Sequence, residues 1–153
     1  MDHHVDKLLD RIGRNILAAL QQNARTPLSR IGQKVGLSAP AVAERVKKLE
    51  EAGVITGYHA RIDPAALGRS VSAFIQLTTD ARHYPAVKRL AADLPQINAC
   101  HHISGDASFI LHVRVDDVAA LETVVARLSP FGQTRTAIVL STPVDKTVML
   151  PVR

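Results

Sequence analysis

The sequence predicts an α+β fold in two parts, and the spacing of its apolar residues supports this prediction. Between residues 10 and 52, apolar side chains recur at i, i+3 and i+4 spacing in three short segments, which is typical of amphipathic helices. Residues 70–142 instead alternate between strand-like and helix-like segments in the order β-α-β-β-α-β. The pair Asp63-Pro64 separates the two patterns. The expected organisation is a helical domain over residues 1–61 that starts with a short polar arm over 1–9, a linker over 62–70, and a second domain over 71–153.

Two helices are expected to form the base of the first domain. Asp10 can cap a helix over about residues 11–22, because its carboxylate accepts hydrogen bonds from the free amides of a first turn. Gly13 lies inside this helix, where a glycine costs about 1 kcal/mol relative to alanine. Thr26 is suited to cap the second helix, and Pro27 is suited to its first position. A glycine then ends this helix and leaves only a tight turn before the next one.

A third helix is expected to begin at the capping residue Ser38, and it is short and cationic. Val42, Val46 and Leu49 have the i, i+4, i+7 spacing of an inward face. A short cationic helix held crosswise on two others fits the major groove of DNA. After it, the β-branched segment over residues 54–62 predicts a hairpin, which would be the wing of a winged helix-turn-helix.

Contacts to double-stranded DNA are expected from several charged or small polar side chains. The first turn of the third helix lacks Arg, Asn and Gln, the side chains that make bidentate contacts with bases. We therefore expect modest direct readout, with specificity also coming from DNA shape. Glu44 and Lys48 are equally consistent with a solvated ion pair four residues apart. The candidate DNA contacts lie in the turn before the second helix, in the second and third helices and in the wing: Arg25, Arg30, Ser38, Ala41, Glu44, Arg45, Lys47, Lys48, His59 and Arg61.

The second part is expected to be a ferredoxin-like βαββαβ domain that forms dimers. Its predicted strands cover residues 70–78, 97–104, 108–115 and 134–142, and its predicted helices cover 84–94 and 117–128. In this plan both helices cover one face of the sheet. Because the other face needs a cover, we expect a second copy of the chain to pair with it and form a homodimer.

Charge and composition favour a nucleic-acid partner and argue against several other classes of protein. The formal net charge is +5, which suits a polyanion. Cys100 is the only cysteine, so no intrachain disulfide can form and a reducing cytoplasm is expected. The polar N-terminus does not resemble a signal peptide, and no apolar run approaches the ~20 residues of a membrane span. No phosphate-binding loop, dinucleotide fingerprint or Gly-x-Ser-x-Gly motif is present, so we expect neither a cofactor nor enzymatic activity.

The histidines and one turn are the remaining candidate sites. His101 and His102 follow each other on a predicted strand and point to opposite faces, so they cannot easily share a metal ion. Cys100 and His102 share a face, but two ligands do not make a zinc site, and we expect no bound metal. His102 or His112 could lie on the exposed sheet face and titrate in a dimer interface. The turn Ser104-Gly105-Asp106 could hold an ammonium group or an anion, or it could be an ordinary β-turn.

Five stretches of the sequence together resemble the Lrp/AsnC (leucine-responsive, feast–famine) family of bacterial and archaeal transcription regulators. They are LDRIGRNILAALQ, VGLSAPAVAERVKKLEEAGVITGY, HARIDPAALG, ACHHISGDASFILHV and TRTAIVLS. The resemblance covers residues 9 to about 146 and implies a winged helix-turn-helix, a ligand-sensing ferredoxin-like domain, and dimers that often assemble into octamers. It also implies an amino acid or related small molecule bound between dimers near the glycine–aspartate turn. The effector contacts that it implies are Ser104, Gly105, Asp106, Ala107, Ser108, Thr134, Arg135 and Thr136.

The sequence departs from the family pattern at two places. Gly13 stands where the family commonly has aspartate. The family's turn usually continues Gly-Asp-aromatic-Asp, whereas here Ala107 and Ser108 follow Asp106, so the carboxylate suited to an effector's amino group is missing. Two alternatives therefore stay open. One is an architectural DNA-binding protein that needs no effector; the other is an enzyme like those relatives that act as decarboxylases in haem biosynthesis, with candidate residues His101, His102, His112 and Arg114.

Overall fold

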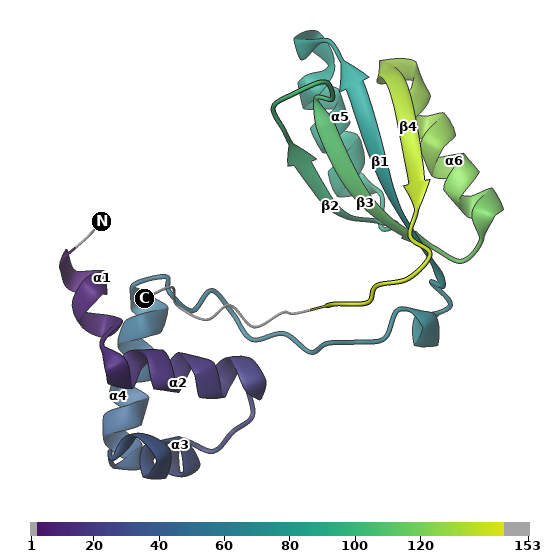
Figure 1. Ribbon diagram of the computed structural model, residues 1–153. Helices are drawn as coiled ribbons and strands as arrows, with labels where there is room; N and C mark the ends of the chain where they lie inside the picture. Colours follow the sequence, from purple (N-terminus) through teal and green to yellow (C-terminus); the bar gives the residue numbers. More distant parts are fainter. Residues whose placement is uncertain (1–2, 146–153) are drawn as a thin grey trace. The chain divides into compact units, whose positions relative to one another are not determined.

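The computed structural model describes residues 3–145, which divide into two units (Figure 1). One unit ends at Arg61 and also contains Val144 and Asp145, and the other spans Ile62–Pro143. Residues 62–70, expected to form a linker, therefore belong to the second unit, where they include a short 3-10 helix, η1, over Ala65–Leu67. The expected extension of the second domain from 146 to 153 lies outside the described residues.

The described part of the first unit contains one more helix than the sequence predicted. Its helices are α1 (His3–Leu8), α2 (Arg11–Gln22), α3 (Leu28–Val35) and α4 (Ala39–Glu51). The extra helix α1 lies in the segment expected to be a polar arm. An apolar contact holds it in place, because Leu8 is buried with Leu17 and Leu49. A second buried cluster joins α2, α3 and α4: Ile16, Leu20, Ile31, Val42 and Val46.

The start of α4 agrees with the prediction, and the start of α3 does not. Ser38 caps α4 as predicted, since its Oγ accepts a hydrogen bond from the amide of Ala41 at 3.4 Å. Thr26 does not cap α3, because its hydroxyl donates to the carbonyl of Asn23 at 2.7 Å. The N-cap of α3 is Pro27, so this helix begins one residue later than predicted.

The predicted hairpin over residues 54–62 is wrong, because this segment contains no strand. Its first two amides donate to the carbonyl of Leu49 at 2.9 and 3.1 Å and so close the end of α4. Farther along, the hydroxyl of Tyr58 donates to Oε1 of Glu50 at 2.7 Å. The first two amides of the segment and the hydroxyl of Tyr58 are thus hydrogen-bonded to α4. The rest of the segment continues without pairing to another strand.

The second unit confirms the predicted ferredoxin-like fold. Its four described strands form one antiparallel sheet in the order β2-β3-β1-β4. The main elements are β1 (Val71–Thr79), α5 (Tyr84–Asp93), β2 (Ile97–His102), β3 (Phe109–Val115), α6 (Val118–Leu128) and β4 (Gly132–Ile138). Two further 3-10 turns, η2 (Ala81–His83) and η3 (Ser129–Phe131), lead into α5 and out of α6. Among residues 3–145, no helix combines the length and the apolar character needed to cross a membrane.

The last strand is displaced from the predicted range of 134–142. It pairs with β1 over Gly132–Ile138. A Cβ atom on Gly132 would lie 2.1 Å from the carbonyl oxygen of Thr78, so the absence of a side chain lets β4 begin this close to β1. Pairing ends soon after residue 138, because β1 begins at Val71 and offers no partner beyond it.

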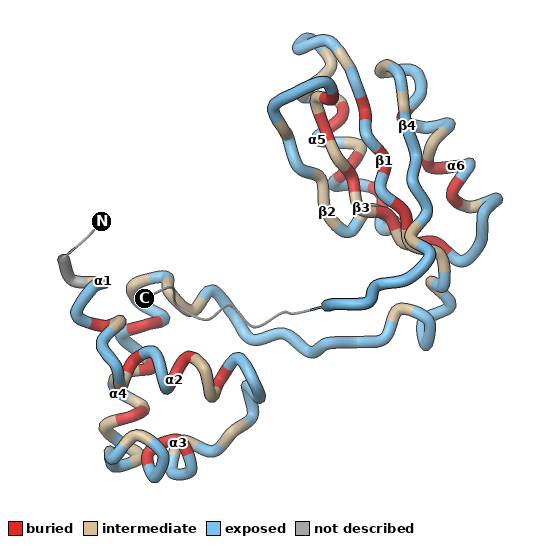
Figure 2. Tube along the Cα trace, in the orientation of Figure 1, coloured by how far each residue is buried: buried red, intermediate tan, exposed pale blue. Residues whose placement is uncertain are grey.

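Helices α5 and α6 both cover one face of the sheet, and the buried residues lie between these two layers (Figures 1 and 2). Alternate residues of the two central strands form this core: Ala73, Ile75, Leu77, Phe109, Leu111, Val113 and Val115. The intervening residues point to the other face, here called the open face, which no described element of the second unit covers. Near its middle, the ring of Phe74 is 41% exposed and stacks on His112 with a centroid distance of 4.8 Å.

Candidate DNA-binding surface and ligand site

Helix α4 has one buried side and one exposed side, as a DNA-reading helix requires. Its buried side holds Val42, Val46 and Leu49, which pack onto α1, α2 and α3. On the other side, Lys47 and Lys48 have exposed side chains, and Ala41 in the first turn is half-buried. The α3–α4 turn is tight because Gly36, two residues before the cap Ser38, adopts a left-handed conformation with φ of 74°.

The exposed charges of α4 also pair with each other along the helix. Nζ of Lys48 lies 3.4 Å from Oε1 of Glu44, and Nζ of Lys47 lies 3.7 Å from Oε1 of Glu51. Such exposed i,i+4 pairs stabilise a helix by only about 0.3–0.5 kcal/mol. A phosphate group can therefore replace either carboxylate as the partner of the lysine at small cost. Both of the alternatives left open for Glu44 and Lys48 are compatible with this geometry.

Arg45, expected to contact DNA, is instead bound within the protein. Its guanidinium donates to both carboxylate oxygens of Asp10 at 2.9 and 3.0 Å. Asp10 is also the N-cap of α2, because its Oδ1 accepts from the amide of Gly13 at 2.7 Å. The hydrogen bond from Arg45 and the bond from the Gly13 amide lower the pKa of Asp10. This bidentate pair holds α4 against the start of α2.

Replacing Asp10 with asparagine should test this pair, because asparagine still caps α2 but removes the charge. We expect a loss of about 0.5–1 kcal/mol at pH 7, given that the pair is partly exposed. Because folding lowers the pKa of Asp10, the ion pair stabilises the protein above the ordinary carboxyl pKa of about 3.9. That contribution is lost as the pH falls through the lowered pKa. Urea unfolding at several pH values should show the difference between the two proteins shrink as the pH falls below about 3.9; a constant difference would contradict the assignment.

The other expected DNA contacts are placed as follows. Arg25 and Arg30 are exposed in the α2–α3 turn and at the start of α3, and neither has an ion-pair partner among residues 3–145. His59 is exposed in the unpaired segment after α4. Arg61 forms an ion pair with Asp145 within the same unit. In that segment, burial and the hydrogen bond to Glu50 raise the pKa of Tyr58 to about 12, so its hydroxyl remains a donor.

The expected effector turn connects β2 to β3 at one end of the sheet. Ser104, Gly105 and Asp106 are exposed, and Gly105 has φ of 114°, which favours glycine. Ala107 is buried. The turn is anchored to β1, because the hydroxyl of Thr78 donates to the carbonyl of Asp106 at 3.1 Å.

Ser108 occupies the place of the missing second carboxylate, and its side chain is already used. Its Oγ donates to the carbonyl of Thr79 at 2.9 Å and accepts from the amide of Thr79 at 3.2 Å. Its own amide donates to the carbonyl of Leu77 at 2.9 Å. Ser108 therefore ties the turn to the end of β1, and the described turn offers a ligand one carboxylate, that of Asp106.

The three expected effector residues of β4 do not all face one ligand. Thr134 and Thr136 lie opposite Leu77 and Ile75, so they point to the helix-covered face. Arg135 lies between them and points to the open face. Of the three, Thr134 lies nearest to the turn. Leu77 of β1 pairs with Thr134 on one side and with Phe109 on the other, and Phe109 directly follows the turn.

The sheet separates His102 from the other candidate residues for metal binding or catalysis. His102 lies on the helix-covered face, where its ring packs 4.7 Å from Tyr84 and 5.0 Å from Phe109, so it is not on the open face as one expectation had it. His101 and His112 point to the open face, as does Arg114. Burial lowers the pKa of His112, and Arg114 lowers it further. Within residues 3–145, no three potential metal ligands of the His, Cys, Asp or Glu type come together.

Comparison with known proteins decides the family. Residues 9–50 match a family model described as the AsnC-type helix-turn-helix domain, and residues 72–149 match the Lrp/AsnC ligand binding domain. The chain belongs to the Lrp/AsnC family of transcriptional regulators. The helix-turn-helix match covers α2, α3 and nearly all of α4, and the second match covers the sheet and its helices. This Lrp/AsnC protein is therefore a DNA-binding transcriptional regulator, and the resemblance stated from sequence is confirmed.

Similar proteins match over nearly their whole length. The HTH-type transcriptional regulator LrpC of Bacillus subtilis is 34% identical over 133 residues, which are 87% of this chain and 92% of LrpC. The regulator LrpA of Mycobacterium tuberculosis is 36% identical over 142 residues, or 90% and 94% of the two chains. A solved M. tuberculosis feast or famine regulatory protein, complexed with L-methionine, superposes with a TM-score of 0.82 at 33% identity, covering 94% of this chain and 99% of that one.

Proposed function

We propose that this Lrp/AsnC regulator acts in the cytoplasm by placing α4 in the major groove of double-stranded DNA. The observation that carries the proposal is the two-sided structure of α4, whose apolar side is fixed by α1, α2 and α3 while Lys47 and Lys48 stay exposed. Arg25 and Arg30 add unpaired positive charge within the described residues of the same unit. Ser38 and Ala41 are proposed to meet phosphate and base edges, and no enzymatic role is proposed.

We propose that a second copy covers the open face of the sheet. That face presents Phe74, Ile110 and His112 side by side on β1 and β3, and none of them is fully buried in one chain. A self-complementary apolar patch of this kind is how most homodimers form. Dimers would place two α4 helices on one DNA molecule, and assembly of dimers into octamers remains our expectation for the larger particle.

A small-molecule effector is proposed at the turn over residues 104–108. The exposed carboxylate of Asp106 can bind an ammonium group, and the complex of a relative with L-methionine supports an amino acid or related metabolite. Because the side chain of Ser108 is engaged with Thr79, we expect weaker recognition of the ammonium group than two carboxylates would provide. An architectural protein without effector is the alternative that this weaker recognition favours.

Replacing Lys48 with alanine should weaken DNA binding and reduce its salt dependence. Fluorescence anisotropy would compare the DNA upstream of the chain's own coding region with random DNA of equal length, over a range of salt concentrations. If Lys48 neutralises one phosphate in each α4, the slope of log affinity against log salt should become less negative by about 0.9 per α4. The control is Lys88→Ala, which removes an exposed lysine from α5. Equal affinity for the upstream and random DNA would reject sequence-specific regulation, and an unchanged slope would reject the role of Lys48.

A further inference from the structure

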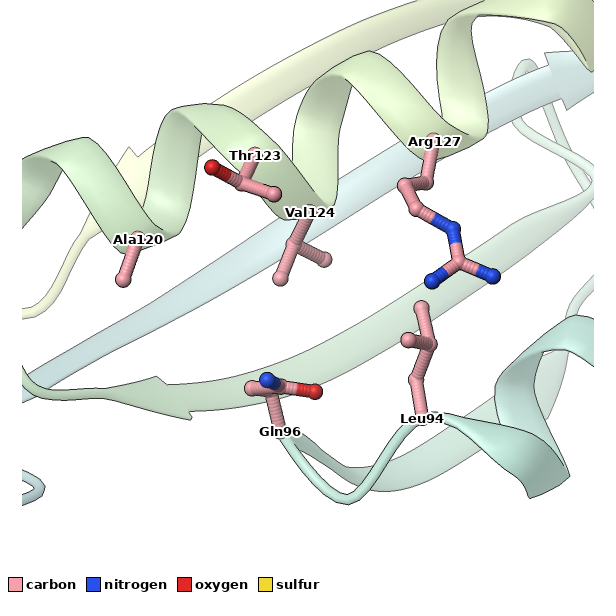
Figure 3. A pocket seen from close by; sticks show the side chains of 6 residues that line it. All are labelled: Leu94, Gln96, Ala120, Thr123, Val124 and Arg127. Atoms are coloured by element: carbon pink, nitrogen blue, oxygen red, sulfur yellow. The ribbon is translucent and has the colours of Figure 1, made fainter.

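The second unit carries its ionisable side chains in two different settings. Beside α6, a cavity of about 160 Å³ lies against the segment that joins α5 to β2 (Figure 3). Its one ionisable lining residue, Arg127, is exposed, so the charge stays in water. On the open face, by contrast, His112 and Arg114 are half-buried within a single chain. A second copy on that face would bury them further, so their charge bears directly on pairing.

His112 lies near the middle of the open face, between two uncharged partners on the neighbouring strands. It pairs with Phe74 of β1, on which its ring stacks, and with Ala99 of β2. Its Nε2 lies 2.9 Å from the hydroxyl oxygen of Ser72. This hydrogen bond fits both the neutral and the protonated ring, because a serine hydroxyl can accept or donate. Protonation therefore changes the charge of the face and leaves the hydrogen bond possible.

The other ionisable groups that the four strands place on the open face are all basic. Arg114 lies two residues beyond His112 on β3. Arg135 lies on β4, and His101 lies on β2. The nearest carboxylate along the chain, Asp116, comes after the end of β3, and Arg114 forms no ion pair among residues 3–145. The described strands thus give this face positive charge and no acid.

A two-fold dimer doubles this arrangement. In such an interface each open face meets its own copy, so the partner brings the same arginines and histidines and again no acid. Burying a positive charge without a partner is costly. Stacking on Phe74 taken alone favours a charged ring, but burial and the charge of Arg114 lower the pKa of His112 already in one chain. The neutral ring is therefore the form that fits between two sheets.

We propose that acidification dissociates the dimer through protonation of His112, so that pairing of the open faces responds to pH. The inference rests on the proposed homodimer and adds a regulation to it. Because the dimer favours the neutral ring, it is fully stable above the pKa of His112 in the separate chain, which lies below the ordinary value of about 6.5. Stability is lost as the pH falls through that pKa. Two copies of His112 titrate in each dimer, so the dissociation constant rises by up to about 100-fold per pH unit.

Sedimentation equilibrium of the intact protein without DNA, at constant ionic strength, would measure the dissociation constant at about pH 7.5 and about pH 5. We expect it to be at least about tenfold larger at the lower pH, while far-UV circular dichroism shows a folded chain at both. His112→Gln keeps a polar partner for Ser72 but cannot gain a charge, so it should pair equally well at both pH values. His102→Gln is the matched control on the helix-covered face and should retain the full pH dependence.

Two results would overturn the inference while the homodimer stands. One is a dissociation constant that is the same at both pH values. The other is a pH dependence that survives His112→Gln or is lost instead in His101→Gln, since His101 is the exposed histidine of the same face. Failure of the homodimer itself is read separately: if Phe74→Asp leaves association unchanged, the open face is not the interface, and both proposals fall.

Discussion

Replacing Phe74 with aspartate is expected to separate the protein into monomers and to reduce its affinity for a promoter by about 100-fold or more. Phe74 stands near the middle of the open face and stacks on His112, so a carboxylate there would be buried without a partner when two sheets meet. A monomer carries one α4. Two linked binding modules bind DNA about 10²- to 10⁴-fold more tightly than one module alone. Dissociation of the dimer would remove roughly this gain in affinity.

Sedimentation of the Phe74→Asp protein at several concentrations would check the first effect, and anisotropy with promoter DNA would check the second. Val118→Asp is the control, because Val118 is also an exposed apolar residue and lies on α6, in the layer that covers the other face. It should leave both measurements unchanged. A Phe74→Asp protein that sediments as the unmodified one does would rule out the open face as the dimer interface.

Replacing Gly13 with alanine is expected to destabilise the helical unit, although glycine-to-alanine changes inside helices usually stabilise by about 1 kcal/mol. A Cβ atom at this position would lie 1.9 Å from the carbonyl oxygen of Leu8 and 3.4 Å from Oδ1 of Asp10. Because the first of these atoms is backbone, the clash can be relieved only by moving α1. That movement takes Leu8 out of its cluster with Leu17 and Leu49. We expect a net loss of about 1–3 kcal/mol, which is the range for overpacking a folded core.

Chemical unfolding of the Gly13→Ala protein, followed by far-UV circular dichroism, would measure this loss. Asn15→Ala is the control, since Asn15 is exposed on the same helix and its replacement should be neutral or slightly stabilising. Stabilisation of the Gly13→Ala protein to the same degree as the control would show that α1 does not pack against this turn. The same contact requires a residue without a side chain at position 13.

The order of secondary structure could be predicted from sequence because it depends on local spacing. Helix α2 has the predicted bounds, and Ser38 caps α4, since both follow from residues within one or two turns. The strand order follows in the same way, because two β-α-β crossovers and one short turn leave few ways to arrange four strands.

The predictions that failed depend on specific partners, some distant in sequence and some near. The pair of Arg45 and Asp10 joins residues 35 positions apart, and no spacing rule identifies it. The hairpin was expected from the strand propensity of β-branched residues. In the structure, the first two amides of this segment instead donate hydrogen bonds to a carbonyl at the end of α4. The cavity lined by Gln96 and Arg127 brings together α6 and the α5–β2 connection, which are adjacent only in the folded chain.

The bond between Arg45 and Asp10 has a consequence for the range of genes under control. An arginine bound to its own scaffold is less available to recognise a guanine, and the first turn of α4 offers serine and alanine in place of longer polar groups. We therefore expect few bases to be discriminated at each half-site and degenerate operators to be tolerated. We expect the choice of promoter to depend on the number and phasing of weak sites along the DNA helix, which suits a regulator that acts broadly across a genome more than one dedicated to a single operon.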